Sequence, residues 1–376
     1  MNIVYVITST GRDVYAAMTR VSAASLRMTN PGARIVVVCD METDRAVRAA
    51  KDFLLGEVDE WLACETPPGD AAFRNRFLKT SLRQRVSGEY LFLDSDTIVR
   101  DDLSPIFRMP GDLAAAPNHS REHIAGQIWE GDLATLAEMQ WAIRPTFYVN
   151  GGVMRVSESK VAHRFYGLWH EKWQASYRRL HKPNDQPALN AAIRESQIEC
   201  ARLPVRFNSQ IGACPVTMRD AAIWHYNSSL EWQNHSHIDE RIQQAIRSDS
   251  VDVAQLRKLM QSQALWTRRF WFVGAGAHMI NGSVRDLVAA VESGPEDAVA
   301  LFRAMQKVDS VYARRVLVKT MADAYWGGAP KAYRFARAML WRRYPCEMAR
   351  QPARGCLLND VCRRFETLGA GLKSRS

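Results

Sequence analysis

Three features are missing from this sequence, and each absence argues against a class of protein. No apolar run approaches the roughly 18 residues that a membrane-spanning helix needs. Met1-Asn2 leads directly into the apolar stretch 3–7 without a basic segment or an Ala-x-Ala site, so we expect no secretory leader. The 7 cysteines are an odd number in a chain of 376 residues, which does not fit a disulfide framework. We therefore expect a cytoplasmic protein with reduced thiols.

The composition is that of a globular protein. Hydrophobic residues make up 47% of the chain and charged residues 24%, which excludes a mainly disordered protein and allows a sizeable core. At about 150 residues per domain, the length indicates two domains.

Positive charge is concentrated at the C-terminal end. The net charge is +10, and residues 331–376 carry eleven Lys or Arg against three acidic residues, so +8 of it lies there. Within 331–343 the basic residues lie largely opposite an apolar helical face. Such a helix packs on its own protein or contacts an anionic surface, here the inner face of a membrane. We do not expect nucleic acid binding, because no recognisable binding motif accompanies the charge.

The first 230 residues alternate strand-like apolar runs with helical patterns, which predicts an α/β sheet. The expected strands are 3–8, 34–39, 89–93, 147–156, with an interruption at 150–152, and 222–226, and the expected helices are 15–28, 43–55 and 70–86.

The pattern changes near residue 240. Beyond it, strand signals are scarce and helical periodicity predominates. We predict a catalytic domain at 1–240 and a helical, basic module at 241–376, with the boundary between 235 and 250. The helices expected in the module are 239–264, 283–305, 310–325 and 330–343.

An acidic pair, Asp94 and Asp96, follows the apolar strand 89–93. A period of two places both carboxylates on the same side of the chain. Two hard oxygen ligands at the carboxyl edge of a sheet suit Mg²⁺ or Mn²⁺. A plain polar turn after a core strand is the alternative.

Two enzyme classes share this signature. In a nucleotide-sugar glycosyltransferase, a metal ion joins the acidic pair to a diphosphate. In a haloacid-dehalogenase-like phosphatase, Asp94 is the nucleophile. The phosphatase motif usually opens its catalytic domain, whereas about 90 residues precede Asp94 here.

Further landmarks occur in a fixed order over residues 1–230. They are Thr8 and Tyr15 after the first strand, Lys79 before the acidic pair, Asp94-Ser95-Asp96 itself, Asn150-Gly151-Gly152, Asp185-Gln186 at a helix start, and His225 on a late strand. Their order and spacing resemble the family 8-like GT-A glycosyltransferases, the group that includes glycogenin and bacterial lipopolysaccharide galactosyl- and glucosyltransferases.

The resemblance implies a GT-A fold, which is a Rossmann-like mixed sheet flanked by helices, and a role in bacterial polysaccharide biosynthesis. It implies transfer of a hexose, with retention, from a nucleoside diphosphate sugar, expected to be UDP-linked, to a hydroxyl of a saccharide, lipid-linked or protein acceptor. The residues implied are Thr8, Tyr15, Lys79, Ser95, Gly151 and Gly152 for the nucleotide sugar, Asn150, Asp185 and Gln186 for the donor sugar and catalysis, and Asp94, Asp96 and His225 for Mn²⁺ or Mg²⁺.

The sequence departs from the family pattern after His225. Relatives often continue with Gly and then Lys, which steadies the leaving phosphate, but this chain has Ser228 and Glu231 near those positions. Phosphate handling and the stereochemical outcome therefore stay open. The phosphatase with Asp94 as nucleophile remains an alternative function, and so does a degenerate GT-A scaffold. For single residues, the alternatives are a helix cap at Asp185 and a buried structural imidazole at His225.

Overall fold

A computed structural model describes the chain in two compact units, Met1–Ala275 and Gly276–Ser376. The described residues are 1–226 except 12, 53, 121–126, 145 and 211–220, and then 251–261, 284, 287–292, 294–308, 310–326 and 328–343. The boundary predicted between 235 and 250 lies outside these residues and stays a prediction.

The first unit is built on a mixed seven-stranded sheet and a smaller three-stranded sheet. Its strands are β1 (Asn2–Ile7), β2 (Arg34–Asp40), β3 (Glu60–Cys64), β4 (Tyr90–Leu93), β5 (Thr97–Val99), β6 (Leu113–Pro117), β7 (Val149–Val156), β8 (Cys200–Arg202), β9 (Ser209–Gln210) and β10 (Ile223–His225). Its helices are α1 (Val14–Thr29), α2 (Met41–Ala50), α3 (Leu54–Glu57), α4 (Ala71–Thr80), α5 (Ser104–Phe107), α6 (Glu130–Glu138), α7 (Lys160–Leu180), α8 (Gln186–Ser196) and α10 (Val253–Gln261).

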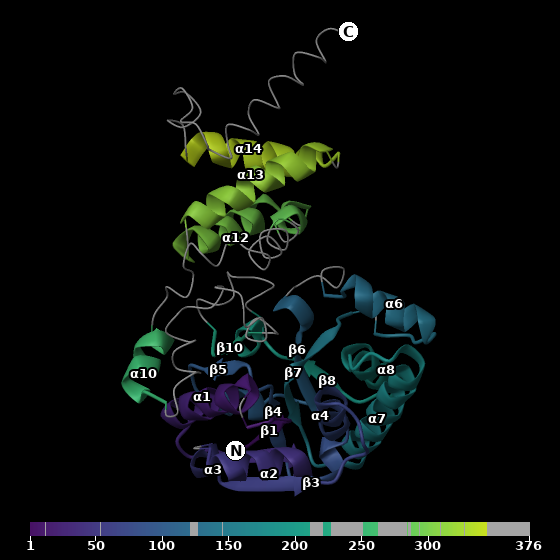
Figure 1. Cartoon of the computed structure of the whole chain (residues 1–376). Helices are drawn as coiled ribbons and strands as arrows, with labels where there is room; N and C mark the ends of the chain where they lie inside the picture. The colour runs from purple at the N-terminus through teal and green to yellow at the C-terminus, as the bar shows by residue number, and fades with distance from the viewer. Residues whose placement is uncertain are drawn as a thin grey trace. The chain divides into compact units, whose positions relative to one another are not determined.

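Helices cover both faces of the large sheet, whose strand order is β3-β2-β1-β4-β7-β6-β8 (Figure 1). Strands β3, β2, β1 and β4 are parallel, and β7 is antiparallel to both neighbours. Along β1, Val4 and Val6 join a core with α4, α7 and α8, whereas Ile3, Tyr5 and Ile7 join a core with α1. A strand buried on both faces explains the unbroken apolar run at the start of the chain.

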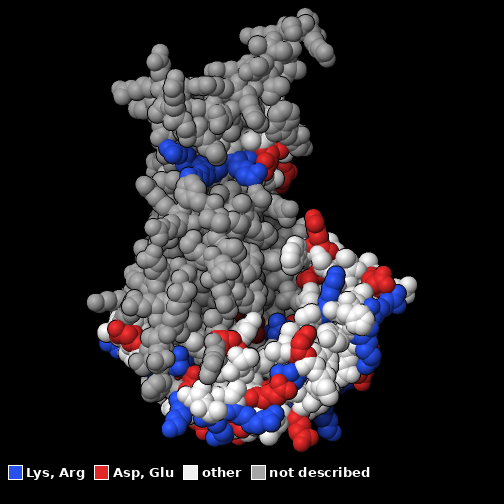
Figure 2. Space-filling model, in the orientation of Figure 1, with Lys and Arg blue, Asp and Glu red and all other residues white. Residues whose placement is uncertain are grey.

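Aspartates at the carboxyl edge of the sheet start the adjacent helices. The side chains of Asp13, Asp40 and Asp70 each accept a hydrogen bond from a backbone N–H in the first turn of α1, α2 and α4. These N-caps fix the residue at which each helix begins after the strand that precedes it. The charged surface of the first unit mixes both signs, with Lys and Arg interspersed among Asp and Glu (Figure 2).

The smaller sheet has the order β5-β10-β9. Strand β5 follows β4 after the turn Asp94–Asp96, and β10 pairs with β5 in antiparallel fashion, which sets His225 opposite Thr97. The pairing therefore brings His225, which lies far along the chain, next to the acidic turn.

Several predicted elements differ in extent. The helix predicted at 43–55 is two helices, because Lys51 has a left-handed conformation with φ of 51°. The helix predicted at 70–86 ends at Thr80 and continues as a 3-10 turn. The interruption predicted at 150–152 is present as an irregularity in pairing: β7 continues through these residues, but its register with β6 shifts between Met154 and Val149.

The second unit is helical in its described residues. Helix α13 (Ser310–Trp326) contacts both α12 (Pro295–Val308) and α14 (Pro330–Arg343), as Figure 1 shows. The helix predicted at 283–305 is broken before Pro295, which starts α12 because its ring fits the first helical turn. The predicted fold class, a mixed α/β sheet flanked by helices and followed by a mainly helical module, is confirmed. Among the described helices, none combines the length and the apolarity that crossing a bilayer requires.

Candidate active site

The acidic pair lies at the turn between the two sheets. Asp94 follows the last residue of β4, and its backbone N–H still donates to Gly152 O at 2.8 Å, as in the β4–β7 ladder. Thr97 Oγ1 donates to Asp94 O at 2.8 Å and closes the turn. The two carboxylates converge as predicted, but the turn brings them together, because residues 94–96 are not in a strand.

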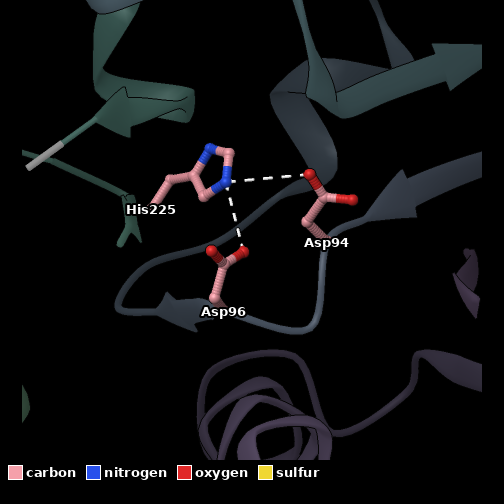
Figure 3. A group of neighbouring side chains, drawn as sticks. All are labelled: Asp94, Asp96 and His225. Atoms are coloured by element: carbon pink, nitrogen blue, oxygen red, sulfur yellow. Dashed lines mark ion pairs between the residues drawn. The ribbon is translucent and has the colours of Figure 1, made fainter. Parts of the chain in front are cut away.

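His225 completes the group from β10 (Figure 3). Its Nε2 atom lies 3.2 Å from Asp96 Oδ1 and 3.7 Å from Asp94 Oδ2. Tyr226 N donates to Asp96 O at 2.9 Å, so the backbone holds β10 against the turn. The ligand atoms of the three residues all lie within 4.8 Å of one another. Two carboxylates and one imidazole nitrogen are a donor set that fits Mn²⁺ or Mg²⁺.

The electrostatics of this group favour a positive charge. Burial by itself lowers the pKa of His225, but Asp96 and Asp94 oppose that effect, and the net pKa is raised above its usual value. The imidazole is only 2% exposed, so the two carboxylates act on it with little solvent screening. A cation attracted to Asp94 and Asp96 therefore competes with the proton on His225.

Gly152 permits this approach because it has no side chain. A Cβ atom at this position would overlap His225 Cε1 and lie only 2.7 Å from Asp94 Oδ2 and 2.9 Å from Asn150 Oδ1. A Cβ atom on Gly151 would instead meet the flexible end of Leu189 at 3.0 Å. The absence of a side chain at Gly152 therefore leaves the space that the His225 ring and the Asp94 carboxylate occupy.

Two cations from α4 flank the acidic residues. Lys79 Nζ donates to Asp94 Oδ1 at 3.0 Å and lies 3.8 Å from Asp185 Oδ2, and Arg76 Nε lies 3.1 Å from Asp185 Oδ1. Lys79 is 4% exposed. Asp185 occupies the N-cap position of α8, but its side chain makes no capping hydrogen bond. Its carboxylate therefore serves this ion-pair network rather than the helix end.

The net charge of this ion-pair network changes sign when a divalent ion binds. Three carboxylates (Asp94, Asp96, Asp185) and two cations (Lys79, Arg76) give it a net charge of −1 when His225 is neutral. A bound dication changes the net charge to +1. The network repels a diphosphate without the ion and attracts one with it.

A cavity of about 200 Å³ extends from the acidic turn. It is lined by Asp94, Ser95, Asp96 and His225, and also by Thr8, Tyr15 and Arg76. The Tyr15 side chain is 37% exposed, while Thr8 is buried and donates to Ala71 O at 3.0 Å. Ser95 Oγ accepts a hydrogen bond from Thr19 Oγ1 at 2.8 Å.

The remaining predicted residues lie behind the acidic group. Asn150 is 5% exposed, and its Oδ1 accepts from Gly152 N at 2.9 Å. Gln186 Oε1 accepts from Gly151 N at 3.3 Å and from Asn150 Nδ2 at 3.4 Å. These side chains hold the backbone of β7 beside Asp94. Ser228 and Glu231, where the sequence departs from the family pattern, lie outside the described residues.

Comparison with solved structures matches this chain to several glycosyltransferases. The galactosyltransferase LgtC in complex with donor and acceptor sugar analogues is 18% identical, with a TM-score of 0.45, over 71% of this chain and 97% of that one. GlyE of Streptococcus pneumoniae is 17% identical, with a TM-score of 0.46, over 70% and 64%. Mouse xyloside xylosyltransferase 1 is 14% identical, with a TM-score of 0.41, over 61% and 99%. No family model and no curated protein sequence matches the chain.

Two residues of the site, Arg76 and Asn208, were not predicted from the sequence. Arg76 lines the cavity and pairs with Asp185, and the signal for it was its position three residues before Lys79 on one face of α4. Asn208 accepts a hydrogen bond from the His225 ring, with Nδ1 and Oδ1 at 2.8 Å. It precedes β9 in a segment with no sequence signal of its own.

Proposed function

We propose that the chain is a metal-dependent glycosyltransferase. It moves a hexose from a nucleoside diphosphate sugar, UDP-linked in our proposal, to a hydroxyl of a saccharide, lipid-linked or protein acceptor, with retention of configuration. The observation that carries the proposal is one cavity with Asp94, Asp96 and His225 at its acidic end and the exposed ring of Tyr15 in its wall. An aromatic platform and a dication site in the same cavity suit a nucleoside diphosphate.

The difficult step is departure of the diphosphate, whose negative charge grows as the glycosidic bond breaks. A Mn²⁺ or Mg²⁺ ion bound by Asp94, Asp96 and His225 would supply Lewis-acid stabilisation of that charge. Arg76 lines the cavity and supplies a guanidinium to the same oxygens. Lys79 is buried and holds Asp94 through Oδ1.

The remaining residues orient the donor. Tyr15 stacks on the base, and Thr8 fixes the strand end beside it. Asp185 accepts hydrogen bonds from sugar hydroxyls, while Asn150 and Gln186 keep β7 in place under the sugar.

Donor hydrolysis in the absence of an acceptor tests the function. Purified protein with Mn²⁺ and a panel of UDP-sugars is expected to release UDP, and to release none after EDTA treatment. Release of inorganic phosphate from simple phosphoesters would instead favour the phosphatase with Asp94 as nucleophile. UDP binding without either reaction would favour the degenerate scaffold.

Asp185→Asn is expected to reduce turnover far more than it reduces UDP affinity. Its carboxylate makes charge-assisted hydrogen bonds, each worth about 1.5–3 kcal/mol, so turnover falls by roughly one to two decades. Steady-state kinetics and UDP titration on the same preparation measure the two effects. An equal loss of UDP affinity would place the role of Asp185 in the ion pairs with Arg76 and Lys79.

Mn²⁺ affinity is expected to depend on pH through His225. The metal binds the neutral imidazole, whose pKa is raised above 6.5, so affinity is full above that pKa and falls about tenfold per pH unit below it. In His225→Ala the affinity is lower and this dependence is flattened, because Asp94 and Asp96 remain the ligands. Calorimetric titration of both proteins between about pH 5 and pH 8 measures it. An unchanged pH profile in the variant would contradict the ligand role.

We also propose that the C-terminal unit contacts an anionic membrane surface. In α14 the residues Ala332, Ala336 and Leu340 are buried. The exposed residues of the helix include Trp341 and the basic residues Lys331, Arg334, Arg337 and Arg342. The helix sequence contains five Lys or Arg and no acidic residue. A basic face with an exposed indole suits anionic headgroups. Residues 344–376, which carry the rest of the predicted basic tail, lie outside the described residues.

Replacing Lys331, Arg334 and Arg337 by Gln is expected to weaken binding to anionic phosphatidylglycerol vesicles by about 100-fold. Each basic side chain near such a surface contributes about 1 kcal/mol. Vesicle co-sedimentation at low and high salt measures the loss. The matched control replaces three exposed basic residues of α7, Lys160, Arg164 and Arg178. Equal losses in both variants, or no vesicle binding by the intact chain, would contradict the proposal.

A further inference from the structure

A row of buried amides leads from the backbone to the ring of His225. Asn118 Nδ2 donates to Gln127 O at 2.7 Å, so the orientation of this amide is fixed by a backbone carbonyl. Asn118 Oδ1 therefore faces the next member, Asn150, and accepts from its Nδ2 at 3.2 Å.

A second backbone group fixes Asn150 independently. Gly152 N donates to Asn150 Oδ1 at 2.9 Å, which requires an oxygen at that position. The same oxygen accepts from Asn208 Nδ2 at 2.9 Å. Asn208 Oδ1 is then the atom that faces His225 Nδ1, at 2.8 Å. The direction of every hydrogen bond in the row follows from two backbone anchors.

All members of the row are buried. Asn118 is 2% exposed, Asn150 5%, Asn208 0% and His225 2%, so bulk water cannot reverse a link by competing for it. Because Asn208 presents an oxygen, a hydrogen bond between it and Nδ1 of His225 requires the proton on that ring nitrogen. The lone pair of the neutral imidazole is then on Nε2, the atom that faces Asp94 and Asp96.

The two carboxylates alone favour the opposite arrangement. Asp96 Oδ1 at 3.2 Å and Asp94 Oδ2 at 3.7 Å are acceptors, and they would draw the ring proton to Nε2. A proton there would occupy the lone pair that a metal ion needs. Asn208 opposes this by requiring the proton at Nδ1.

We propose that Asn208 is a positioning residue that keeps His225 in the Nδ1–H tautomer, so that Nε2 is available to a divalent ion. The hydrogen bonds of Asn118 and Asn150 fix the orientation of the Asn208 amide. The proposal rests on the proposed function in one respect only, namely that a divalent ion binds this group. Metal-ligating histidines commonly donate their second ring N–H to a neighbouring acceptor, and loss of that acceptor costs about 10- to 100-fold in metal affinity.

The tautomer can be observed without any metal. The ¹⁵N spectrum of His-labelled, metal-free protein at about pH 8.5, above the usual imidazole range, reports which nitrogen carries the proton. The His225 signal is identified by its loss in His225→Ala. We expect Nδ1–H in the wild-type protein and Nε2–H in Asn208→Leu. Nε2–H in the wild-type protein would overturn the proposal, and so would retention of Nδ1–H in Asn208→Leu.

Mn²⁺ titration followed by electron paramagnetic resonance is the second measurement. The dissociation constant is expected to rise about 10- to 100-fold in Asn208→Leu. Asn208→Asp keeps an acceptor for Nδ1–H but loses the donor to Asn150 Oδ1 and adds a negative charge near the dication site, so its dissociation constant is expected to stay below that of Asn208→Leu. Asn30→Leu is the matched control: it makes the same change at a buried Asn that bonds Asp101 O and Leu103 N, and its affinity is expected to stay within about threefold of wild type.

The two measurements separate the failures. Equal losses of Mn²⁺ affinity in Asn208→Leu and Asn30→Leu would overturn the positioning role. If the wild-type protein shows Nδ1–H but binds no Mn²⁺, the metal part of the proposal and the proposed function both fall, whereas the tautomer assignment stands.

Discussion

Asp96→Asn is expected to abolish Mn²⁺-dependent UDP binding and sugar transfer while the protein stays folded. The substitution keeps the size of the side chain but removes one of the two anionic ligands, and the net charge of the network becomes less favourable for a dication. Mutating a residue that only hydrogen-bonds to a metal ligand typically lowers metal affinity about 10- to 100-fold. Loss of a ligand itself is therefore expected to lower it about 100-fold or more. Calorimetric titration with Mn²⁺ and UDP measures it.

Asp102→Asn is the matched control for Asp96→Asn. Asp102 lies a short way along the chain from the acidic turn, is exposed, and accepts hydrogen bonds from Ser104 N and Oγ. The Asp102→Asn variant loses the same negative charge as Asp96→Asn, but the charge lies outside the cavity. Its affinities for Mn²⁺ and for UDP are therefore expected to be unchanged. Full transfer activity in Asp96→Asn, with circular dichroism like that of the wild type, would refute the site.

Gly152→Ala is expected to reduce Mn²⁺ affinity about as strongly as loss of a ligand. The added methyl group would occupy the space of His225 Cε1 and press on Asp94 Oδ2, so two of the three ligand side chains must move. Such overpacking costs about 1–3 kcal/mol of folding stability. Mn²⁺ titration and thermal unfolding of the variant measure the two effects separately.

Gly151→Ala is the matched control for Gly152→Ala. Its methyl group would meet Leu189 Cδ2 at 3.0 Å and Lys79 Nζ at 3.9 Å, both ends of flexible side chains. We expect Mn²⁺ affinity within about threefold of wild type, because neither contact moves a ligand. Equal losses in the two variants would mean that Gly152 has no special part in the geometry.

The acidic site was predictable because its signals are local. A buried strand that ends in Asp94 is visible in a short window of sequence, and so is the apolar run before His225. The sequence also predicted that the ligands lie at the carboxyl edge of the sheet, since strands deliver their following residues there. The structure adds how they meet, through the pairing of β5 with β10.

Local preference indicated the irregularity in β7 but not its form. Asn150-Gly151-Gly152 favours a bend by residue type, and in the structure β7 continues while its pairing with β6 shifts register across these residues. At Lys51 local preference missed the change, because a left-handed residue ends a helix that residue type would have continued. Both differences arise from tertiary contacts, which residue propensities do not include.

The supporting residues were not predictable because their partners are distant in sequence. Asn208 and Asn150 are 58 positions apart and bond only after β7 and the segment before β9 are in place. Asp185 was expected at a helix start, and it is there, but its carboxylate turns to Arg76 and Lys79 on α4 instead of capping. Such roles depend on tertiary packing, which no short motif encodes.

Anomalous scattering from a crystal soaked with UDP and Mn²⁺ would show whether a metal ion binds at the acidic turn. We expect a manganese peak bounded by carboxylate oxygens of Asp94 and Asp96 and by Nε2 of His225, with the diphosphate on its open side and the uracil beside Tyr15. UDP bound in the cavity with no manganese at these three side chains would contradict this expectation.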